Sequence, residues 1–348
     1  MMPDAEKCAR HFKHTAQRKN NTSAPPPSNI GLYQIAFISF NLSNFKPRKA
    51  GTGYRGRHGC AARYLETSGR RLQAPDQSGN RPWKHSIVTT HIIIYMNEME
   101  LLVQLHRNNL RQGPGSEETT LLAAHLGHIN KEKEYRIADL GCGTGAQTIH
   151  LAKMLKGEIV AVDLFPTFLN KLKENYDHEV KQGNVTASLR TIAASMDSLP
   201  FDKEEFDIIW SEGAIYNIGF ERGVNYWKHF LKKEGILAVS ELSWTTRKRP
   251  SEVELFWNSE YPEMNTIAGK TAILEDAGYK VLGHFILPDN CWTDNYYLPL
   301  LKRHNEFLQA YGENELARQI VEKDRQEFEL YKKYREFYNY GFYIAQKA

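Results

Sequence analysis

The stretch Asp139-Leu140-Gly141-Cys142-Gly143-Thr144-Gly145-Ala146 decides the fold. Before it lies a compact apolar segment, residues 136–140, which predicts a strand. After it, the apolar stripe of residues 146–155 predicts a helix. Glycines between a strand and a helix let the backbone turn tightly and approach a ligand, because no Cβ stands in the way. The stretch therefore predicts a ligand-binding loop at the edge of an α/β sheet.

The segments that follow alternate between strand and helix patterns, which is typical of a parallel sheet covered by helices. Further strands are predicted at residues 159–162, 191–194, 206–210 and 236–239, and helices at residues 167–176, 224–233 and 267–277. Gly235 and Gly278 follow the last two helices as stop signals. A strand at 280–287, a long helical region at about 295–337 and a last strand at 341–345 complete the chain. With helical sequence between them, the last two strands predict an antiparallel, hairpin-like edge.

Charge divides the 348 residues into two unlike parts. Residues 1–95 hold 15 Lys and Arg against four acids, a net charge of +11, whereas the remaining 253 residues carry −7. The first part has a proline cluster at 24–28 and little apolar periodicity, which indicates disorder. It fits a nucleic-acid-binding arm, an Arg-rich transit peptide or an extension outside the working domain. We favour the extension, because helix-like patterning begins at Met96 to Met99, so we expect one domain over residues 96–348.

Other classes are disfavoured by composition. No run approaches the roughly 20 apolar residues that a membrane-spanning helix needs. The four cysteines are scattered without a CxxC pair, so neither a disulfide scaffold nor a metal site is expected, and the cytoplasm is the expected compartment.

Two kinds of cofactor fit the glycine loop, and charge distinguishes them. Gly141, Gly143 and Ala146 also satisfy the dinucleotide fingerprint GxGxxG/A, with Asp163 at the expected distance for a ribose. A dinucleotide places its pyrophosphate over the loop, where Asp139 is repulsive. S-adenosylmethionine carries a positive ammonium and sulfonium, which Asp139 attracts. Asp197 follows the third strand, where it is placed to accept the adenine amino group at the cofactor edge of the sheet.

These segments resemble the class I S-adenosylmethionine-dependent methyltransferases, most closely a small-molecule branch that includes quinone-biosynthesis C-methyltransferases. The resemblance covers roughly residues 96–348 and is specific over 137–146, 160–163, 196–201 and 206–211; residues 111–116 resemble a lead-in of bacterial members. It implies a Rossmann-like, seven-stranded sheet with an antiparallel last strand and a helical insertion before it.

The resemblance also implies roles for individual residues. Asp139 would lie near the methionine amino group, and Gly141, Gly143 and Gly145 would form the cofactor loop. The remaining cofactor contacts would divide between the nucleoside and the methionine end. At the nucleoside, Asp163 would hold the ribose, Leu164 would pack near the adenine, and Asp197 with Ser198 would meet the adenine amino group. At the methionine end, the lining residues would be Ser211 and Glu212.

The acceptor is less defined. The (Asn/Asp/Ser)-Pro-Pro-aromatic motif of nucleic-acid amine methyltransferases is missing after the fourth strand, which reads Ser211-Glu212-Gly213-Ala214-Ile215-Tyr216-Asn217. We therefore expect a small-molecule acceptor and no nucleic acid. Position at the active edge selects Tyr216, Asn217, Trp244, Trp292 and Tyr296 as substrate candidates. No catalytic residue is assigned, because a general base is needed only if the nucleophile arrives protonated. An NAD-dependent oxidoreductase and a catalytically silent S-adenosylmethionine-binding module remain the alternatives.

Overall fold

The computed structural model describes residues 98–348. The predictions for residues 1–95, and for a start at Met96, lie outside the described residues. Over the described range, no helix has both the length and the apolar character needed to cross a membrane.

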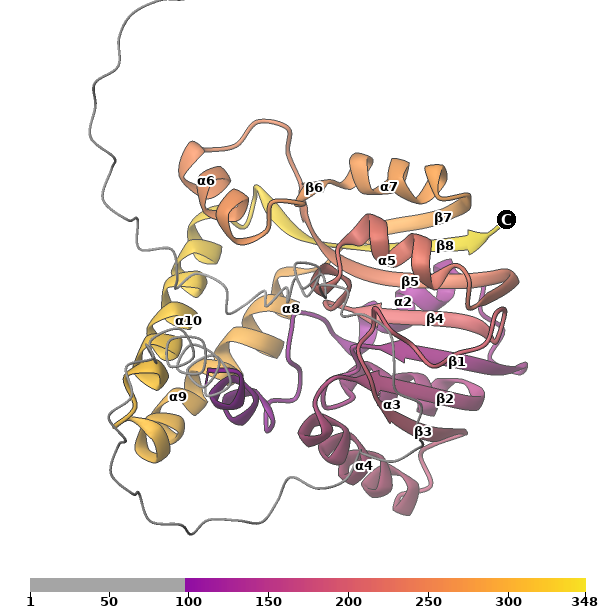
Figure 1. The fold of residues 1–348 in the computed structure, drawn as a ribbon, viewed down its shortest axis with the longest axis horizontal. Coiled ribbons are helices and arrows are strands. Elements are labelled where there is room, and N and C mark those ends of the chain that lie inside the picture. The colour runs from indigo at the N-terminus through magenta and orange to yellow at the C-terminus, as the bar shows by residue number, and fades with distance from the viewer. Residues whose placement is uncertain (1–97) are drawn as a thin grey trace, which may run out of the picture. The chain divides into compact units, whose positions relative to one another are not determined.

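One mixed β-sheet organises the described residues (Figure 1). Its strands are β1 Glu134–Leu140, β2 Lys156–Asp163, β3 Ala187–Ala193, β4 Phe206–Glu212, β5 Leu231–Trp244, β6 Asn265–Thr266, β7 Tyr279–Ile286 and β8 Tyr338–Lys347. Seven of them lie in the order β3-β2-β1-β4-β5-β8-β7, and the two-residue β6 pairs with β5. Strands β1 to β5 pair in parallel, whereas β8 runs antiparallel to both β5 and β7. The predicted sheet with an antiparallel last strand is confirmed, and β6 is an addition to it.

Both faces of the sheet are covered by helices, because successive strand residues alternate between two apolar clusters. In β1, Ile137 packs on one face with residues of α3 (Ala146–Met154), whereas Ala138 packs on the other with residues of α5 (Phe220–Trp227) and α7 (Ile267–Asp276). The helices in chain order are residues 98–106, α2 Glu117–Leu126, α3 Ala146–Met154, α4 Pro166–Lys181, α5 Phe220–Trp227, α6 Ser251–Glu260 and α7 Ile267–Asp276. Strands buried on both faces explain why the sequence shows continuous apolar runs there.

The predicted helical insertion lies between β7 and β8. It consists of α8 Asp289–Trp292, a π-helical segment Thr293–Tyr297, α9 Leu298–Tyr311 and α10 Glu315–Tyr334. Figure 1 shows α8, α9 and α10, together with α6, beyond the carboxyl ends of the parallel strands. The insertion therefore stands at the edge of the sheet where α/β proteins bind ligands.

One predicted helix is wrong in its extent. Residues 224–233 were expected to form a helix ended by Gly235, but α5 ends at Trp227 and β5 begins at Leu231. Leu231 pairs with Phe206 of β4 and is fully buried, and Gly235 lies inside the strand. A buried leucine fits the helical and the strand period equally well, so periodicity alone did not separate them.

Candidate functional site

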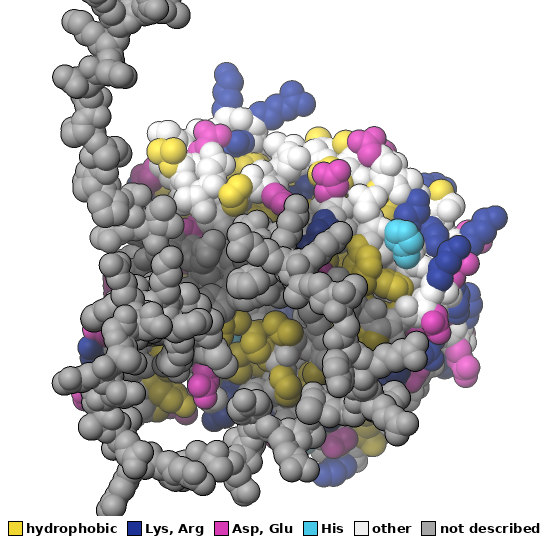
Figure 2. All heavy atoms as spheres, in the orientation of Figure 1, with side chains coloured by type: hydrophobic (Ala, Val, Ile, Leu, Met, Phe, Trp, Pro, Cys, Tyr) yellow, Lys and Arg dark blue, Asp and Glu magenta, His cyan; other side chains and the backbone are white. Residues whose placement is uncertain are grey.

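A cavity of about 470 Å³ opens at the carboxyl ends of β1, β2 and β4. Its wall is formed by the glycine loop after β1, the residues after β2, β3 and β4, and the segment that precedes α2. In Figure 2, hydrophobic side chains gather in the middle of the face shown, with charged side chains toward its rim. Within residues 98–348, three acids and one arginine line the cavity, namely Asp163, Asp197, Glu212 and Arg111.

The glycine loop closes tightly against its neighbours. The amides of Gly141 and Cys142 both donate to the Val162 carbonyl, at 2.8 and 3.0 Å. Gly141 has φ +73°, and a Cβ at this position would lie 2.4 Å from the Ala214 Cβ. Only glycine satisfies both this backbone conformation and this spacing. The loop therefore presents bare backbone to the cavity.

Asp163 joins the end of β2 to this loop. Its Oδ2 accepts from the Gly143 amide at 2.9 Å, and its Oδ1 accepts from the Phe165 amide at 2.9 Å. Asp163 lines the cavity, and burial raises the pKa of its carboxyl group. Each carboxylate oxygen has a second lone pair, so the side chain still has acceptor capacity toward a ligand in the cavity.

Asp139 lies one layer deeper. It is fully buried, and its carboxylate accepts from Thr148 Oγ1 at 2.5 Å and from Gln147 Nε2 at 3.2 Å. Burial raises the pKa of Asp139 to about 7. Gln147 lines the cavity and Asp139 does not, so the Gln147 amide stands between Asp139 and any bound molecule.

At the end of β3, Asp197 lines the cavity and Ser198 does not. Ser195 Oγ donates to Asp197 Oδ1 at 2.5 Å, and Arg222 Nη2 lies 3.2 Å from Asp197 Oδ2. Leu164, which follows Asp163, also lines the cavity and is 57% exposed. An acid and an apolar side chain thus stand at this part of the rim.

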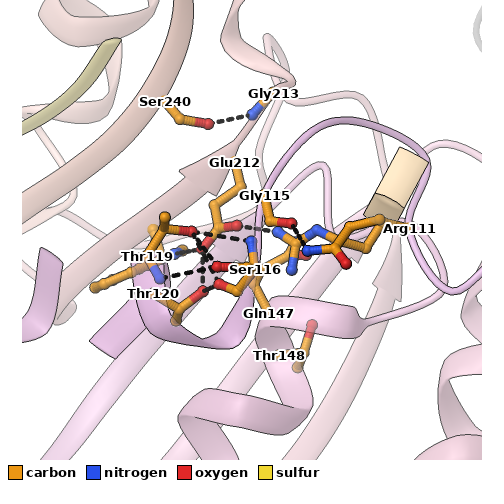
Figure 3. Close-up of polar contacts among 12 residues, drawn as sticks. Arg111, Gly115, Ser116, Thr119, Thr120, Gln147, Thr148, Glu212, Gly213 and Ser240 are labelled. Atoms are coloured by element: carbon orange, nitrogen blue, oxygen red, sulfur yellow. Dashed lines mark hydrogen bonds and ion pairs between the residues drawn. The ribbon is translucent and has the colours of Figure 1, made fainter. Parts of the chain in front are cut away.

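Glu212 and Arg111 form a buried ion pair in the cavity wall. Figure 3 shows their side chains pointing toward one another, with Thr120 beside the carboxylate. Glu212 Oε1 also accepts from Thr120 Oγ1 at 2.7 Å and from Trp210 Nε1 at 2.9 Å. Arg111 Nη2 makes the ion pair, whereas the buried Nη1 has no hydrogen-bond partner among the described residues. Arg111 lines the cavity, and a guanidinium with an unused donor is suited to an anionic group of a ligand.

Sequence reasoning gave no role to Arg111 or Gln112, which the structure places in the wall. Gln112 Oε1 accepts from the Thr144 amide at 2.8 Å, and Gln112 Nε2 donates to the carbonyls of His106 and Asn109. This side chain ties the segment before α2 to the glycine loop. The only signal in the sequence was the lead-in motif at 111–116.

The other predicted site residues divide between the cavity and the core. Tyr216 and Asn217 line the cavity, and Asn217 Nδ2 donates to the Ala214 carbonyl at 2.9 Å. Gly145 precedes α3 as its N-cap, and Ser211 is buried, where its hydroxyl donates to the Leu140 carbonyl at 2.8 Å. The aromatic candidates that pack in the core and do not line this cavity are Trp244, Trp292 and Tyr296.

No group of three or more His, Cys, Asp or Glu within residues 98–348 is arranged to hold a metal ion. The wall of the cavity offers a ligand hydrogen-bond acceptors, one arginine with an unused donor, and apolar surface.

Comparison with known proteins places this arrangement in context. Residues 138–239 match the family described as a methyltransferase domain. The chain is 28% identical over 191 residues to the ribosomal protein L11 methyltransferase of Alkaliphilus metalliredigens, covering 49% of this chain and 54% of that protein. The chain thus spans about half the length of the curated relatives it matches.

Two solved structures share the fold. The YjhP protein of E. coli has a TM-score of 0.62 and 18% identity, over 71% of this chain and 99% of that one. A S-adenosylmethionine-dependent methyltransferase of Geobacter sulfurreducens, in complex with S-adenosyl-L-homocysteine, has a TM-score of 0.62 and 15% identity, over 72% of this chain and 98% of that one. With the family match, the strand order and the glycine loop, these likenesses agree on one architecture. Residues 138–239 match the methyltransferase-domain family, and residues 98–348 have the fold of the class I S-adenosylmethionine-dependent methyltransferases.

Proposed function

We propose that this protein binds S-adenosylmethionine in the cavity and transfers its methyl group to a small-molecule acceptor. The observation that carries the proposal is the pairing of two features in one cavity wall. One is Asp163, fastened to the glycine loop by the Gly143 amide; the other is Arg111, which has a buried, unpaired Nη1 beside Glu212. A ligand with vicinal hydroxyls, a carboxylate and positive charge matches both.

The described residues fit each part of this cofactor. Asp163 would accept from the ribose hydroxyls, and Asp197 from the adenine amino group, with Leu164 against the adenine. Arg111 Nη1 would donate to the methionine carboxylate. The ammonium would lie near Glu212, and the charge of Asp139 would reach it through the Gln147 amide; these roles extend the sequence-based assignments of Asp139, Asp163 and Asp197.

Charge in the wall disfavours a dinucleotide. Among residues 98–348, three acids and one arginine line the cavity, so acids outnumber the single cation in its wall. A pyrophosphate carries two negative charges and would be repelled by such a wall, although the amino end of α3 alone attracts anions. The sulfonium and ammonium of S-adenosylmethionine are favoured there instead.

When bound, the sulfonium supplies a methyl carbon that is already activated for in-line displacement. The protein's contribution is then to align the acceptor and exclude water, and such positioning supplies about 7–11 kcal/mol of a barrier. Tyr216 and Asn217, which line the cavity after β4, are the residues we propose to face the acceptor. The likeness to quinone-biosynthesis C-methyltransferases stays a prediction, as do the substrate roles of Trp244, Trp292 and Tyr296.

We propose further that residues 1–95 are an extension outside the working domain and that the protein acts in the cytoplasm. The free, buried thiols of Cys142 and Cys291 support a reducing compartment.

The test begins with thermal melting of the full chain with S-adenosyl-L-homocysteine or NAD. A ligand at 100 times its Kd stabilises the folded state by about 2.7 kcal/mol, so the melting temperature should rise with the first compound and not with NAD. A rise only with NAD would overturn the proposal in favour of an oxidoreductase.

Transfer of radiolabelled methyl from S-adenosylmethionine is then measured over a metabolite library, with ribosomal protein L11 included because the relatives carry that name. Label on a metabolite supports the proposal. Label only on ribosomal protein L11 would overturn the small-molecule acceptor. Binding of S-adenosylmethionine without any methyl transfer would favour a catalytically silent S-adenosylmethionine-binding module.

A further inference from the structure

A second buried ion pair lies next to the cavity. Glu241 in β5 and Lys270 in α7 have side chains 0% and 1% exposed, and Lys270 Nζ lies 3.7 Å from Glu241 Oε1. Lys270 Nζ also donates to the Tyr261 hydroxyl at 3.3 Å, and it stands over the Phe220 ring at 4.5 Å from the centroid. Three charged or polar groups from separate elements thus converge in the core; we call Glu241, Lys270 and Tyr261 the buried triad.

Stability does not explain this arrangement. Removing two charges from water costs several kcal/mol for each ion, and replacing a buried pair by apolar side chains of similar size is often neutral or stabilising. Burial opposes both charges here, since it raises the pKa of Glu241 and lowers the pKa of Lys270. A pair with this cost indicates a role in specifying one local arrangement.

Tyr261 links the buried triad to the wall of the cavity. The Tyr261 ring packs edge-on against the Tyr216 ring, with centroids 6.3 Å apart and an interplanar angle of 70°. Tyr216 belongs to the short 3-10 helix Ile215–Asn217, which follows β4, and it lines the cavity. The Tyr261 ring therefore links Tyr216 to Lys270, whose charge is held by Glu241.

We propose that Glu241, Lys270 and Tyr261 are positioning residues that hold the Tyr216 ring in one orientation at the acceptor end of the cavity. The contact with the acceptor rests on the proposed function, whereas the positioning of Tyr216 does not. The Glu241 carboxylate holds the Lys270 ammonium in place by its charge, and the ammonium donates to the Tyr261 hydroxyl. The Tyr261 ring, fixed in this way, limits the orientations that the Tyr216 ring can take.

The experiment separates positioning from stability. The full chain is labelled with 3-fluorotyrosine, and Tyr216 is assigned in the ¹⁹F NMR spectrum by its loss in Tyr216→Phe. Three variants are compared with the wild type: Lys270→Met, the double variant Glu241→Met/Lys270→Met, and Tyr261→Phe. The control is Asp207→Asn/Lys232→Met, which removes a partly exposed Lys–carboxylate pair of 2.9 Å between β4 and β5, at the ends of these strands that lie away from the cavity.

We expect Lys270→Met to lower the melting temperature, because it leaves Glu241 buried without its counter-charge. The double variant should regain the wild-type melting temperature to within a few degrees. Its Tyr216 resonance should nevertheless shift or split, and Tyr261→Phe should shift it too, while the control variant leaves it unchanged. A merely structural pair predicts instead that restored stability restores the resonance.

A wild-type Tyr216 resonance in the double variant and in Tyr261→Phe would overturn the proposal. If the double variant fails to fold, Tyr261→Phe decides alone, since it deletes one hydroxyl and keeps the ring. The affinity for S-adenosyl-L-homocysteine is measured in parallel and should stay within threefold of wild type. If the wild type does not bind S-adenosyl-L-homocysteine, the proposed function is overturned, but the outcome for Tyr216 stays the same.

Discussion

At the scale of single residues, Asp163 does two things with one carboxylate. Both of its oxygens accept backbone hydrogen bonds, one from the loop after β1 and one from the chain leading into α4. Asp163 also lines the cavity. A change at this position therefore disturbs the loop as well as any ligand that binds there.

We predict that Asp163→Asn weakens binding of S-adenosyl-L-homocysteine at least tenfold, which is about 1.4 kcal/mol. Either orientation of the new amide sets an NH₂ group against a backbone N–H, from Gly143 or from Phe165, so part of the loss comes from displacement of the loop. Isothermal calorimetry measures the affinity, with Asp177→Asn on the exposed side of α4 as the control. Unchanged affinity would show that the ribose is held elsewhere.

A second prediction concerns Arg111, whose Nη1 has no described partner. Arg111→Met should lower the affinity for S-adenosyl-L-homocysteine by tenfold or more, because the charge-assisted bond to the carboxylate is lost. 5′-Methylthioadenosine, which has no carboxylate, should bind both proteins within threefold. The control is Arg190→Met on β3, at an ion pair outside the cavity. An equal loss for both ligands would contradict the role assigned to the guanidinium.

Sequence reasoning located the acids of this site and missed its arginine, for a physical reason. Asp163 comes directly after a predicted strand and Asp197 lies three residues beyond the next one, and the carboxyl ends of parallel strands meet at one edge. Arg111 lies in an irregular segment and meets Glu212 across 101 positions in the chain, so no local pattern announces the contact. Aromatic residues were ambiguous, because large rings serve cores and binding sites alike.

At the scale of elements, the junction between the glycine loop and α3 is set by packing against α4. Gly145 has φ +87°, and a Cβ at this position would lie 2.0 Å from Leu172 Cδ1. Leu172 is fully buried in α4, so it has little room to move. The loop and the two helices therefore form one packed unit.

Gly145→Ala should lower the free energy of unfolding by roughly 2–5 kcal/mol. A positive φ costs an alanine about 1–2 kcal/mol, and overpacking of the Leu172 side chain adds about 1–3 kcal/mol. Gly183→Ala is the matched control, because Gly183 has φ +70° with open space around its Cβ position. Urea denaturation measures the free energy of unfolding of both variants, compared at equal m-values. An equal loss in the two variants would mean that Leu172 and α4 move aside at no energetic cost.

The order of strands and helices was predictable where apolar runs are bounded by turns, as at β1 and β2. The boundary between α5 and β5 was not predictable, because the buried Leu231 fits the helical and the strand periodicity equally well. Helix α6 was not predicted at all, since only Val253 and Trp257 of its ten residues are buried. Elements that bury little surface leave little pattern in the sequence.

At the scale of the whole molecule, a buried acid makes stability depend on pH. The pKa of Asp139 is about 7 in the folded protein, against 3.8 as its ordinary value. Between these two values the folded state holds a proton that the unfolded state has released. By linkage this contribution to stability is lost as pH rises through the window, at roughly 1 kcal/mol per pH unit.

We predict that Asp139→Asn makes the fall in melting temperature between pH 5 and pH 7 less steep, because it removes one of the groups that hold a proton there in the folded state. Glu241, Glu260 and Glu327, whose pKa values burial also raises to about 7, keep their share of the slope. Calorimetric scans of both proteins at half-unit steps give the two slopes. Glu158→Gln, at a partly exposed ion pair with Arg136, is the control and should keep the wild-type slope. Parallel curves for wild type and Asp139→Asn would contradict the raised pKa.

The division of the chain gives a further expectation. A protein that begins at Met96 should fold and bind S-adenosyl-L-homocysteine like the full chain, because net charge and patterning change there and Leu101 and Leu105 already belong to the core. Circular dichroism and calorimetry of the two proteins make the comparison. A shortened protein that fails to fold would show that the basic segment belongs to the domain.

The position of β8 has a consequence for how the molecule is made. It is the last strand in chain order, yet it lies between β5 and β7. During synthesis β7 emerges first and finds no neighbour until residues 287–337 have been added, an interval of roughly 3–10 s at about 5–20 residues per second. The flank of β5 that pairs with β8 waits longer, because residues 245–337 separate the two strands, an interval of roughly 5–19 s at the same rate. A nascent chain thus passes through a state with an open sheet edge, which is where a chaperone that shields unpaired strands would act.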